Sequence, residues 1–462
     1  MRREGACYYT GRSGLRTTAG EPPPDALFCL QGNRKISEPL IIPRAQHSLS
    51  RALISDNALK VIGRLKQAGY AGLLVGGCVR DLLLGREPKD FDVVTDARPE
   101  EVKKIFSSAH LIGRRFRLAH VRFGRDIVEV ATFRAAPERA GDNVDNNVFG
   151  TREEDARRRD FTVNALYYDV DDDTVIDYVD GMADLKSGLL RMIGDPVARY
   201  REDPVRMLRA IRFAAKLGFL IEPDTADPIR PHGHLLLGVP PARMFEEVLK
   251  LFHGGHAAAT FELLRTHGLF RFLFPLTEKS LAREDGGSPR TLVPQALANT
   301  DARVAEDKPV TPAFLFAALL WEPVRDNAAA RMAHGMRPLE ALDRAAEEVL
   351  HDTLKHVTIP RRFSAPMREI WSMQARLERR SGRQPFRLLE HKRFRAAYDF
   401  LMLRAHTGEA DAELSEWWTR FQEVTEEERR EMVAAVRPTA GTGKRRRRRR
   451  RHRSNATERA HT

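Results

Sequence analysis

The chain is poor in cysteine, and it lacks a long apolar run. Its 462 residues include only Cys7, Cys29 and Cys78, and the odd number and wide spacing of these cysteines argue against a disulfide framework or a zinc motif. No segment approaches the roughly 18 consecutive apolar residues of a membrane-spanning helix. The basic first residues also lack the apolar core of a secretory signal. We therefore expect a protein of a reducing, cytoplasmic compartment without a membrane span.

Positive charge is concentrated near the end of the chain. The net charge is +13, and nine positive charges lie in one tail formed by Lys444, Arg445, Arg446, Arg447, Arg448, Arg449, Arg450, Arg451 and Arg453. The rest of the chain carries only a small positive excess. An arginine tail binds an RNA backbone without sequence preference and with a steep salt dependence. A targeting signal and a solvated tail are the alternative interpretations of this segment.

Composition and patterning divide the chain into five parts. Residues 1–45 are rich in Gly, Pro, Arg and Ser without periodicity, which predicts a disordered N-terminal extension. After it we expect a mixed α and β head at 46–195, a helical neck at 196–260, a helical body at 261–437 and a disordered arginine-rich tail at 438–462. The predicted fold class is therefore α+β, with the head followed by an all-α neck and body.

Turn residues bracket the short apolar segments of the head. The predicted elements are a helix at 55–69 capped by Ser55, strands at 73–75 and 91–94, a helical turn at 79–84, and two hairpins, one from 118–123 with 127–133 and one from 166–170 with 175–179. Further helices are predicted to begin at Asp203-Pro204 and Pro240-Pro241, because proline suits the first helical turn.

The segment KDFDVV carries two carboxylates, Asp90 and Asp92, on an expected strand. Positions i and i+2 of a strand point to the same face, so the two side chains lie together. A hard divalent cation such as Mg²⁺ relieves their repulsion, since it prefers oxygen ligands. Glu129, on a second expected strand, is the candidate for a third carboxylate. The alternatives are two solvated acids and an outward-facing Glu129 on an edge strand.

A glycine pair and an arginine precede these acids. Gly76 and Gly77 lie at the junction between an expected strand and a helical turn. Because they lack side chains, they allow backbone N–H groups to approach a phosphate chain. Arg80 is close enough along the chain to neutralise such a ligand. The alternative for a glycine pair alone is an ordinary tight turn.

A stripe of arginines marks the helix expected after Pro204. Arg206, Arg209 and Arg212 lie three residues apart, and like charges on one stripe repel unless an anion lies against them. A triphosphate or an RNA backbone meets that need. Asp203 directly precedes Pro204, which is the position of an N-cap.

Longer segments resemble the class II nucleotidyltransferases of the polymerase-β superfamily. The resemblance is carried, in order, by LLVGGCVRDLLLGREPKDFDVVT, ARRRDFTVNALYYD, DYVDGMADLKSGLLRMIGDP and REDPVRMLRAIRFAAKLGF, and it covers about residues 42–430. GRRFRLAHVRFG, PRRFSAPMREIW, RLLEHKRFRAAYDFLMLRA and the arginine-rich tail are similar to the bacterial poly(A) polymerase branch rather than to the CCA-adding branch. The resemblance implies a polymerase-β-like nucleotidyltransferase head.

The resemblance also implies roles for individual residues. Asp90 and Asp92 are implied to hold two Mg²⁺ ions, and Asp160 to belong to the active site. Independently of the resemblance, Asn164 lies four residues after Asp160, a spacing that on a helix would let it orient Asp160 by a hydrogen bond. The implied contacts to the nucleotide and its triphosphate are Gly77, Arg80, Arg158, Asp203, Arg206, Arg209 and Arg212, with Arg159 a weaker candidate. Asp203 is also implied to read the edge of adenine, a role that competes with capping the helix.

The activity implied by the resemblance is that of a template-independent polynucleotide adenylyltransferase. Such an enzyme transfers AMP from ATP to RNA 3′ ends and releases pyrophosphate. We expect it to act as a monomer in RNA processing and decay, with RNA-decay proteins as candidate partners. CCA addition to tRNA and non-catalytic RNA binding are the alternative functions.

Overall fold

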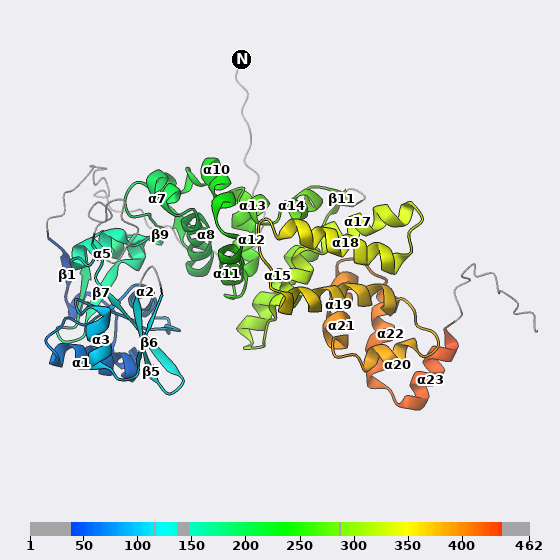
Figure 1. Cartoon of the computed structure of the whole chain (residues 1–462), viewed down its shortest axis with the longest axis horizontal. Helices are drawn as coiled ribbons and strands as arrows, with labels where there is room; N and C mark the ends of the chain where they lie inside the picture. Colours follow the sequence, from blue (N-terminus) through cyan, green and yellow to red (C-terminus); the bar gives the residue numbers. More distant parts are fainter. Residues whose placement is uncertain (1–37, 114–116, 136–147, 286–287, 437–462) are drawn as a thin grey trace, which may run out of the picture.

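The computed structural model describes residues 38–113, 117–135, 148–285 and 288–436, which form an elongated molecule (Figure 1). A mixed α and β head lies at one end, and helices extend from it to the other end. The predicted α+β class is confirmed. No helix among these residues is both long and apolar enough to cross a membrane. The predicted tail at 438–462 lies outside the described residues, as do residues 1–37.

The centre of the head is a β-sheet of eight strands. Their bounds are β1 (Leu40–Ile42), β2 (Leu73–Val75), β3 (Asp92–Thr95), β4 (Ala109–Ile112), β5 (Leu118–Phe123), β6 (Asp126–Thr132), β7 (Leu166–Asp169) and β8 (Thr174–Asp177). They lie in the order β1-β8-β7-β2-β3-β6-β5-β4. Every neighbouring pair is antiparallel except β3 with β6, which is parallel. The parallel register places Asp92 directly beside Glu129.

Helices cover both faces of this sheet. They are α1 (Asp56–Gln67), α2 (Gly77–Leu83), α3 (Pro99–Ile105), α5 (Arg152–Arg158) and α6 (Gly181–Ser187), with 3-10 turns η1 (Arg44–Gln46), η2 (Arg51–Leu53) and η3 (Thr162–Asn164). Leu74 and Val93 pack in one core with α1 and α3. Val94 packs on the other face with Ala156 of α5. Since residues two apart share a face of a strand, Asp92 lies on the α5 side.

The chain after the head is almost entirely helical. Its helices are α7 (Pro196–Glu202), α8 (Val205–Leu217), α9 (Pro223–Ala226), α10 (Ile229–His232), η4 (Gly233–Gly238), α11 (Pro241–Phe252), α12 (Ala257–Thr266), α13 (Phe270–Leu273), α14 (Pro275–Leu281), α15 (Leu292–Ala305), α16 (Pro312–Leu319), α17 (Trp321–Ala333), α18 (Pro338–Thr353), α19 (Arg361–Leu377), α20 (Gln384–Leu389), α21 (Phe394–His406), α22 (Ala412–Glu423) and α23 (Glu426–Ala435). Short strand pairs also occur, β9 (Leu189–Leu190) with β10 (Leu220–Ile221) and β11 (Glu284–Asp285) with β12 (Ser288–Pro289). The apolar core is continuous from the sheet to α21, and a second cluster around Trp418 joins α19 to α22.

Most of the predicted elements are confirmed. The side chain of Ser55 accepts a hydrogen bond from the N–H of Asn57 and caps α1. Both predicted hairpins are present, as β5–β6 and β7–β8. The two predicted proline starts are also correct, because α8 follows Pro204 and α11 begins at Pro241.

Two predictions are corrected. The N-terminal extension, predicted to reach residue 45, ends earlier because Leu40–Ile42 forms β1 and pairs with β8. All three residues of this strand are apolar, so the sequence shows no alternation of apolar and polar residues that would predict a strand. Only Ile42 is buried, and the hydrogen bonds of the backbone with β8 stabilise the strand. The strand predicted at 91–94 begins at Asp92. Asp90 therefore lies in the segment before the strand, where the spacing rule for strands does not fix its direction.

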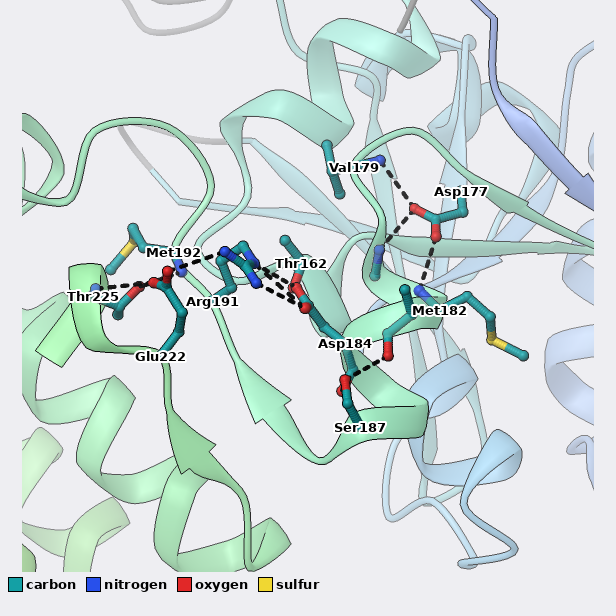
Figure 2. Close-up of polar contacts among 12 residues, drawn as sticks. Thr162, Asp177, Val179, Met182, Asp184, Ser187, Arg191, Met192, Glu222 and Thr225 are labelled. Atoms are coloured by element: carbon teal, nitrogen blue, oxygen red, sulfur yellow. Dashed lines mark hydrogen bonds and ion pairs between the residues drawn. The ribbon is translucent and has the colours of Figure 1, made fainter. Parts of the chain in front are cut away.

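A polar network joins the head to the first helices that follow it (Figure 2). The guanidinium of Arg191 donates to Asp184 of α6 at 3.1 Å and to Glu222, the residue before α9, at 3.0 Å. Asp184 also accepts a 2.7 Å hydrogen bond from the Thr162 hydroxyl. Both carboxylates are buried, so each needs its partners to remain charged. The segment at Thr162, which closely follows Asp160, is thereby fixed to the next part of the chain.

Gly181, the first residue of α6, gives a test of this junction. A Cβ on Gly181 would lie 2.2 Å from the carbonyl oxygen of Thr162. We expect Gly181→Ala to lower the free energy of unfolding by about 1–3 kcal/mol, because the Thr162 segment must move to accommodate the methyl group. Urea unfolding followed by circular dichroism measures this change.

Gly63→Ala is the matched control on the exposed side of α1, since nothing lies within 4 Å of its added Cβ. Alanine is the better helix former, so this variant should be more stable by about 0.5–1 kcal/mol. A Gly181→Ala variant as stable as the wild type would contradict the close packing of α6 on Thr162.

Candidate active site

A cavity of about 430 Å³ lies between the head and the helices that follow it. The head lines it with Gly76, Gly77, Arg80, Asp92, Arg159, Asp160 and Asn164, and the following helices line it with Asp203, Val205, Arg206, Arg209, Phe213, Arg243 and Glu247. Besides Arg159 and Asn164, eight residues predicted for nucleotide binding and catalysis line this one space. They are Gly76, Gly77, Arg80, Asp92, Asp160, Asp203, Arg206 and Arg209. Segments far apart in the sequence thus meet at a single site.

The glycine turn between β2 and α2 forms one side of the cavity. Gly76 has φ = 78°, a left-handed conformation that glycine adopts without strain. A Cβ on Gly76 would also lie 3.3 Å from Nη1 of Arg159. The turn therefore needs glycine for its backbone and for the close approach of Arg159, and it leaves the backbone unobstructed towards the cavity.

Asp92 lies at the edge of the cavity among other carboxylates. Burial and the nearby carboxylates of Glu129 and Asp90 raise the pKa of Asp92 to about 6, although Arg159 opposes the shift. Glu129 is adjacent on β6, and Asp90 is exposed before β3. Oε1 of Glu129 lies 3.1 Å from Nε2 of His120 on β5. The other two predicted carboxylates thus both act electrostatically on Asp92.

The negative charge of these carboxylates suits a divalent cation. Their side chains are not, however, arranged around one common point as the ligands of a metal ion are. Within the part of the chain that the structure describes, no group of three or more His, Cys, Asp or Glu side chains is arranged to hold a metal ion. Asp90 and Glu129 are also absent from the cavity lining. The raised pKa of Asp92 indicates that protein groups compensate its charge only in part. A hard cation with carboxylate ligands supplies the missing positive charge.

Asp160 is buried at the junction of the head with α8. It accepts hydrogen bonds from Nδ2 of Asn164 at 3.0 Å, from the N–H of Phe161 at 2.8 Å and from Nε of Arg209 at 2.7 Å. Burial opposes its charge, but Arg209 and Asn164 hold the pKa of Asp160 below its usual value. The predicted bond from Asn164 is confirmed. Its setting differs from the prediction, because Asn164 lies on η3 while Asp160 precedes that turn.

Two of the three predicted arginines of α8 reach the cavity. Arg206 and Arg209 line it, whereas Arg212 does not. The guanidinium of Arg212 instead lies 4.8 Å from the ring centroid of Phe213. Positions three apart on an α-helix rotate by about 60° at each step, so the third residue of the stripe turns away. Arg206 is already paired with Glu202, whose carboxylate it contacts at 2.6 Å.

The two carboxylate oxygens of Asp203 have different partners. Oδ1 accepts a 3.2 Å hydrogen bond from the N–H of Val205 at the start of α8, which is the predicted capping contact. Oδ2 accepts a 2.7 Å bond from Arg243 of α11. Arg243 and Glu247 also line the cavity, although neither is among the residues predicted from the sequence. They lie on a different helix, 40 or more residues along the chain, and belong to no motif that indicated a ligand.

Arg159, the weaker candidate in the sequence, lines the cavity, and Arg158 does not. The guanidinium of Arg159 donates to Asp155 at 2.9 Å and to the Tyr167 hydroxyl at 3.3 Å. Arg158 instead donates to the carbonyl oxygen of Ala135 at 2.5 Å. A run of arginines in sequence does not reveal which one faces the cavity, since that depends on where α5 ends.

Family models match three stretches of the chain: the "Poly A polymerase head domain" at residues 73–191, the "Probable RNA and SrmB- binding site of polymerase A" at 218–281, and the "Polymerase A arginine-rich C-terminus" at 334–453. "Poly(A) polymerase I" of Escherichia coli O6:H1 is 51% identical over 399 residues, which cover 83% of this chain and 85% of that protein. The chain belongs to the poly(A) polymerase I family. The predicted bacterial poly(A) polymerase branch and the adenylyltransferase class are confirmed.

Poly(A) polymerases of this family share their fold with CCA-adding enzymes. The "CC-adding tRNA nucleotidyltransferase" of Halalkalibacterium halodurans is 38% identical over 220 residues, which cover 48% of this chain and 54% of that protein. The crystal structure of the Bacillus stearothermophilus CCA-adding enzyme in complex with CTP has a TM-score of 0.57 at 29% identity and covers 79% of this chain and 82% of its own. The predicted nucleotidyltransferase fold is confirmed, and nucleotidyltransferases of this family use nucleoside triphosphates and a divalent metal.

The shifted pKa of Asp92 has a consequence for stability in the absence of metal. Its pKa of about 6 in the folded protein lies above the ordinary value of 3.8, so folding favours the protonated form. This contribution to stability is complete below about pH 4 and is lost as the pH rises through about 6. We expect metal-free Asp92→Asn, which stays neutral, to have a higher Tm than the wild type at pH 8 and the same Tm near pH 4. Differential scanning fluorimetry in a chelating buffer measures both.

Asp172→Asn, in the exposed turn between β7 and β8, is the control and should not change the Tm at either pH. A lower Tm for Asp92→Asn than for the wild type at pH 8 would mean that Asp92 is stabilised in its charged form, against the raised pKa.

Proposed function

We propose that the chain adds AMP from ATP to RNA 3′ ends, without a template and with release of pyrophosphate, and that the cavity between the head and α8 is the site of this reaction. The observation that carries the proposal is the division of charge in that cavity. Arg80, Arg159, Arg206, Arg209 and Arg243 give the cavity a wall rich in arginine, in which Asp160, Asp203 and Glu247 also lie, and Asp92 lies on the side of the sheet. The arginines can bind the negatively charged triphosphate, and Asp92 can bind a cation that also contacts the acceptor hydroxyl.

The cation ligands in this proposal are Asp90 and Asp92, with Glu129 as a third carboxylate. Two Mg²⁺ ions held by these residues would supply charge neutralisation for the acceptor 3′-hydroxyl and for the leaving pyrophosphate. The protein's own contribution is to hold the acids together before any ligand binds. The parallel pairing of β3 with β6 fixes Asp92 beside Glu129, and the segment before β3 carries Asp90.

The triphosphate is assigned to the turn at Gly76 and Gly77 and to Arg80. Nε of Arg80 donates to Asp81 at 2.8 Å, and Nη1 donates to Asn164. The Arg80 side chain is buried, so these bonds hold its guanidinium in one orientation before ATP arrives. An arginine fixed in this way loses little conformational freedom on binding and orients the α-phosphorus for attack.

The base is assigned to Asp203 and Arg206. Oδ1 of Asp203 accepts from Val205 and Oδ2 from Arg243, and a carboxylate oxygen has two lone pairs, so acceptor capacity remains for the adenine amino group. Capping and base reading then use different lone pairs of the same side chain. The protein, rather than a nucleic acid template, selects ATP in this proposal.

The remaining predicted residues act through their neighbours. Asp160 holds Arg209 in the cavity wall through the bond at 2.7 Å. Arg212 supports the wall by packing on Phe213. Arg158 fixes the end of α5 and with it the position of Arg159, which follows directly. None of these contributions requires a direct contact with ATP.

The same proposal assigns a different role to each of three parts of the chain. Residues 46–195 form the catalytic head, 196–260 the neck that reads the nucleotide, and 261–437 the body that grips RNA. The family model matching residues 218–281, which is named for RNA binding, supports an RNA contact near the neck and body. The enzyme acts in this proposal as a monomer in the cytoplasm, on RNAs that enter processing and decay, together with RNA-decay proteins.

CCA addition is the second candidate, because 220 residues of the chain match a CC-adding tRNA nucleotidyltransferase at 38% identity. The two functions differ in the nucleotide used and in the length of the product. With ATP alone and an unstructured RNA, we expect a long A tail, and with CTP alone no extension. Addition that stops after three nucleotides on a tRNA would instead support CCA addition.

The carboxylates give the direct test of the chemistry. Asp90→Asn and Asp92→Asn should each reduce AMP addition by about a thousandfold or more, since each removes a ligand for cations that supply several kcal/mol of transition-state stabilisation. Gel analysis of a labelled RNA primer with ATP measures the rate. Asp172→Asn, in an exposed turn far along the chain from both acids, should keep the wild-type rate, and a near-normal rate for Asp90→Asn or Asp92→Asn would remove that residue from the site.

The arginine-rich tail from Lys444 to Arg453 lies outside the described residues and keeps its predicted role as an RNA-backbone contact. Deleting residues 438–462 should reduce the dependence of log Kd for RNA on log salt by several units, because each phosphate neutralised on a single strand contributes about 0.7. AMP transfer at saturating primer should remain. Fluorescence anisotropy over a range of salt concentrations measures the slope, and an unchanged slope would count against RNA binding by the tail.

A further inference from the structure

A line of polar side chains continues from Asp92 across the sheet. The register places Asp92 on β3 beside Glu129 on β6, Glu129 beside His120 on β5, and His120 beside His110 on β4. Residues paired in register point to the same face. Nε2 of His120 lies 3.1 Å from Oε1 of Glu129. Asp92, which lines the cavity, is therefore the first residue of a row that continues across the three strands β6, β5 and β4.

The face that carries this row is open over β4 to β6. Ile112 and Ile127 are 48% and 41% exposed, and His110 is also exposed. The side chain of Glu129 is 46% exposed, and that of His120 is 19% exposed. We call these five residues the open face. Among the described residues, the helices α1 and α3 pack on the opposite side of the same strands, so the open face has no covering layer there.

The cavity that suits a nucleotide lies on the other side of Asp92. Its lining comes from the turn after β2, the segment before β7, and the helices α8 and α11, and none of its residues belongs to β4, β5 or β6. In the sheet, β2 flanks β3 on one side and β6 flanks it on the other. In-line displacement requires the attacking oxygen to approach opposite the leaving group. With the triphosphate in the cavity, the acceptor hydroxyl must therefore approach Asp92 from the side of β6.

We propose that the open face holds the 3′-terminal nucleotide of the acceptor RNA, and that His120, held against Glu129, positions its ribose. This inference rests on the proposed function, because it requires nucleotidyl transfer at Asp92. A terminal ribose presents neighbouring 2′ and 3′ hydroxyls, each of which donates and accepts hydrogen bonds. The imidazole and carboxylate pair offers both kinds of partner, and Ile112 and Ile127 offer apolar surface to a base.

His120 is a positioning residue in this proposal, so its loss should affect the acceptor and not the nucleotide. We expect His120→Ala to raise the KM for an unstructured RNA primer by about five- to tenfold, the size of one lost hydrogen bond. The KM for ATP and the kcat at saturating primer should stay within about twofold of the wild type. His120→Gln, which keeps a hydrogen-bonding group near the position of Nε2, should restore part of the affinity.

The terminal 2′-hydroxyl provides a second readout that a general loss of structure would not change. A primer with a single 2′-deoxyribose at its 3′ end should be used less efficiently than RNA by the wild type, because the 2′-hydroxyl is what distinguishes RNA from DNA at a given site. The His120→Ala variant should discriminate much less between the two primers. Equal discrimination by the wild type and by His120→Ala would overturn the role of His120.

Two variants near the open face serve as controls, one on helix α3 and one on strand β4. Lys103→Ala lies on α3, which covers the opposite face, and should leave the primer KM unchanged. His110→Ala lies one strand farther from Asp92 and should raise the primer KM by less than His120→Ala. Equal effects of the two histidine variants would mean that the face binds RNA without positioning the terminal ribose.

The outcomes separate this inference from the proposed function. If the wild type extends RNA with ATP and His120→Ala keeps the wild-type primer KM, only the role of the open face is lost. If the wild type transfers no AMP, the proposed function itself fails. Should His120→Ala fold poorly, the same measurements on His120→Gln and on the deoxy-ended primer decide the question.

Discussion

The ion pair between Asp160 of the head and Arg209 of α8 determines where the cavity forms. Its atoms approach to 2.7 and 2.5 Å, and the side chain of Asp160 is only 10% exposed. A buried carboxylate without its cation is strongly disfavoured, so the pair keeps the head and α8 together. Arg199 strengthens the junction by donating to the carbonyl oxygens of Arg158 and Arg159 at 2.6 and 2.7 Å. The glycine turn and α8 are thereby held on opposite sides of one space.

Two aspartates of this cavity have pKa values that are shifted in opposite directions. Asp160 has its pKa lowered, because Arg209 and Asn164 outweigh the effect of burial. Asp92 has its pKa raised to about 6, because burial and the acids Glu129 and Asp90 outweigh Arg159. The first aspartate is therefore satisfied by the protein itself and suits a structural role. The second retains a charge that the fold does not neutralise, which is the property required of a cation ligand.

Local sequence patterns predicted most of the strands and helices of the head. Site residues whose position depends on contacts between distant parts of the chain could not be predicted in this way. Glu129 was identifiable because strand alternation fixes its face, although only the parallel register shows that it adjoins Asp92. Arg243 was not identifiable, since its contact with Asp203 depends on how α11 packs against α8. Helical spacing predicted a stripe of three arginines, but the rotation of α8 excludes Arg212 from the cavity. Single residues, such as the two aspartates of KDFDVV, each had an alternative interpretation. The class of enzyme was identified by the longer motifs shared with the family.

Among the described strands of the main sheet, β3 and β6 form the only parallel pair, and the segment between them is separate from the segments that line the cavity. Parallel strands cannot be joined by a tight turn, so the chain leaves β3, forms α3, β4 and β5, and returns along β6. None of the residues that line the cavity lies on that part of the chain. Substitutions or insertions within it can alter the surface beyond Glu129 while leaving the glycine turn, Asp92 and α8 in place. The head is in this sense modular, because the surface beyond Glu129 and the lining of the cavity come from different segments of the chain.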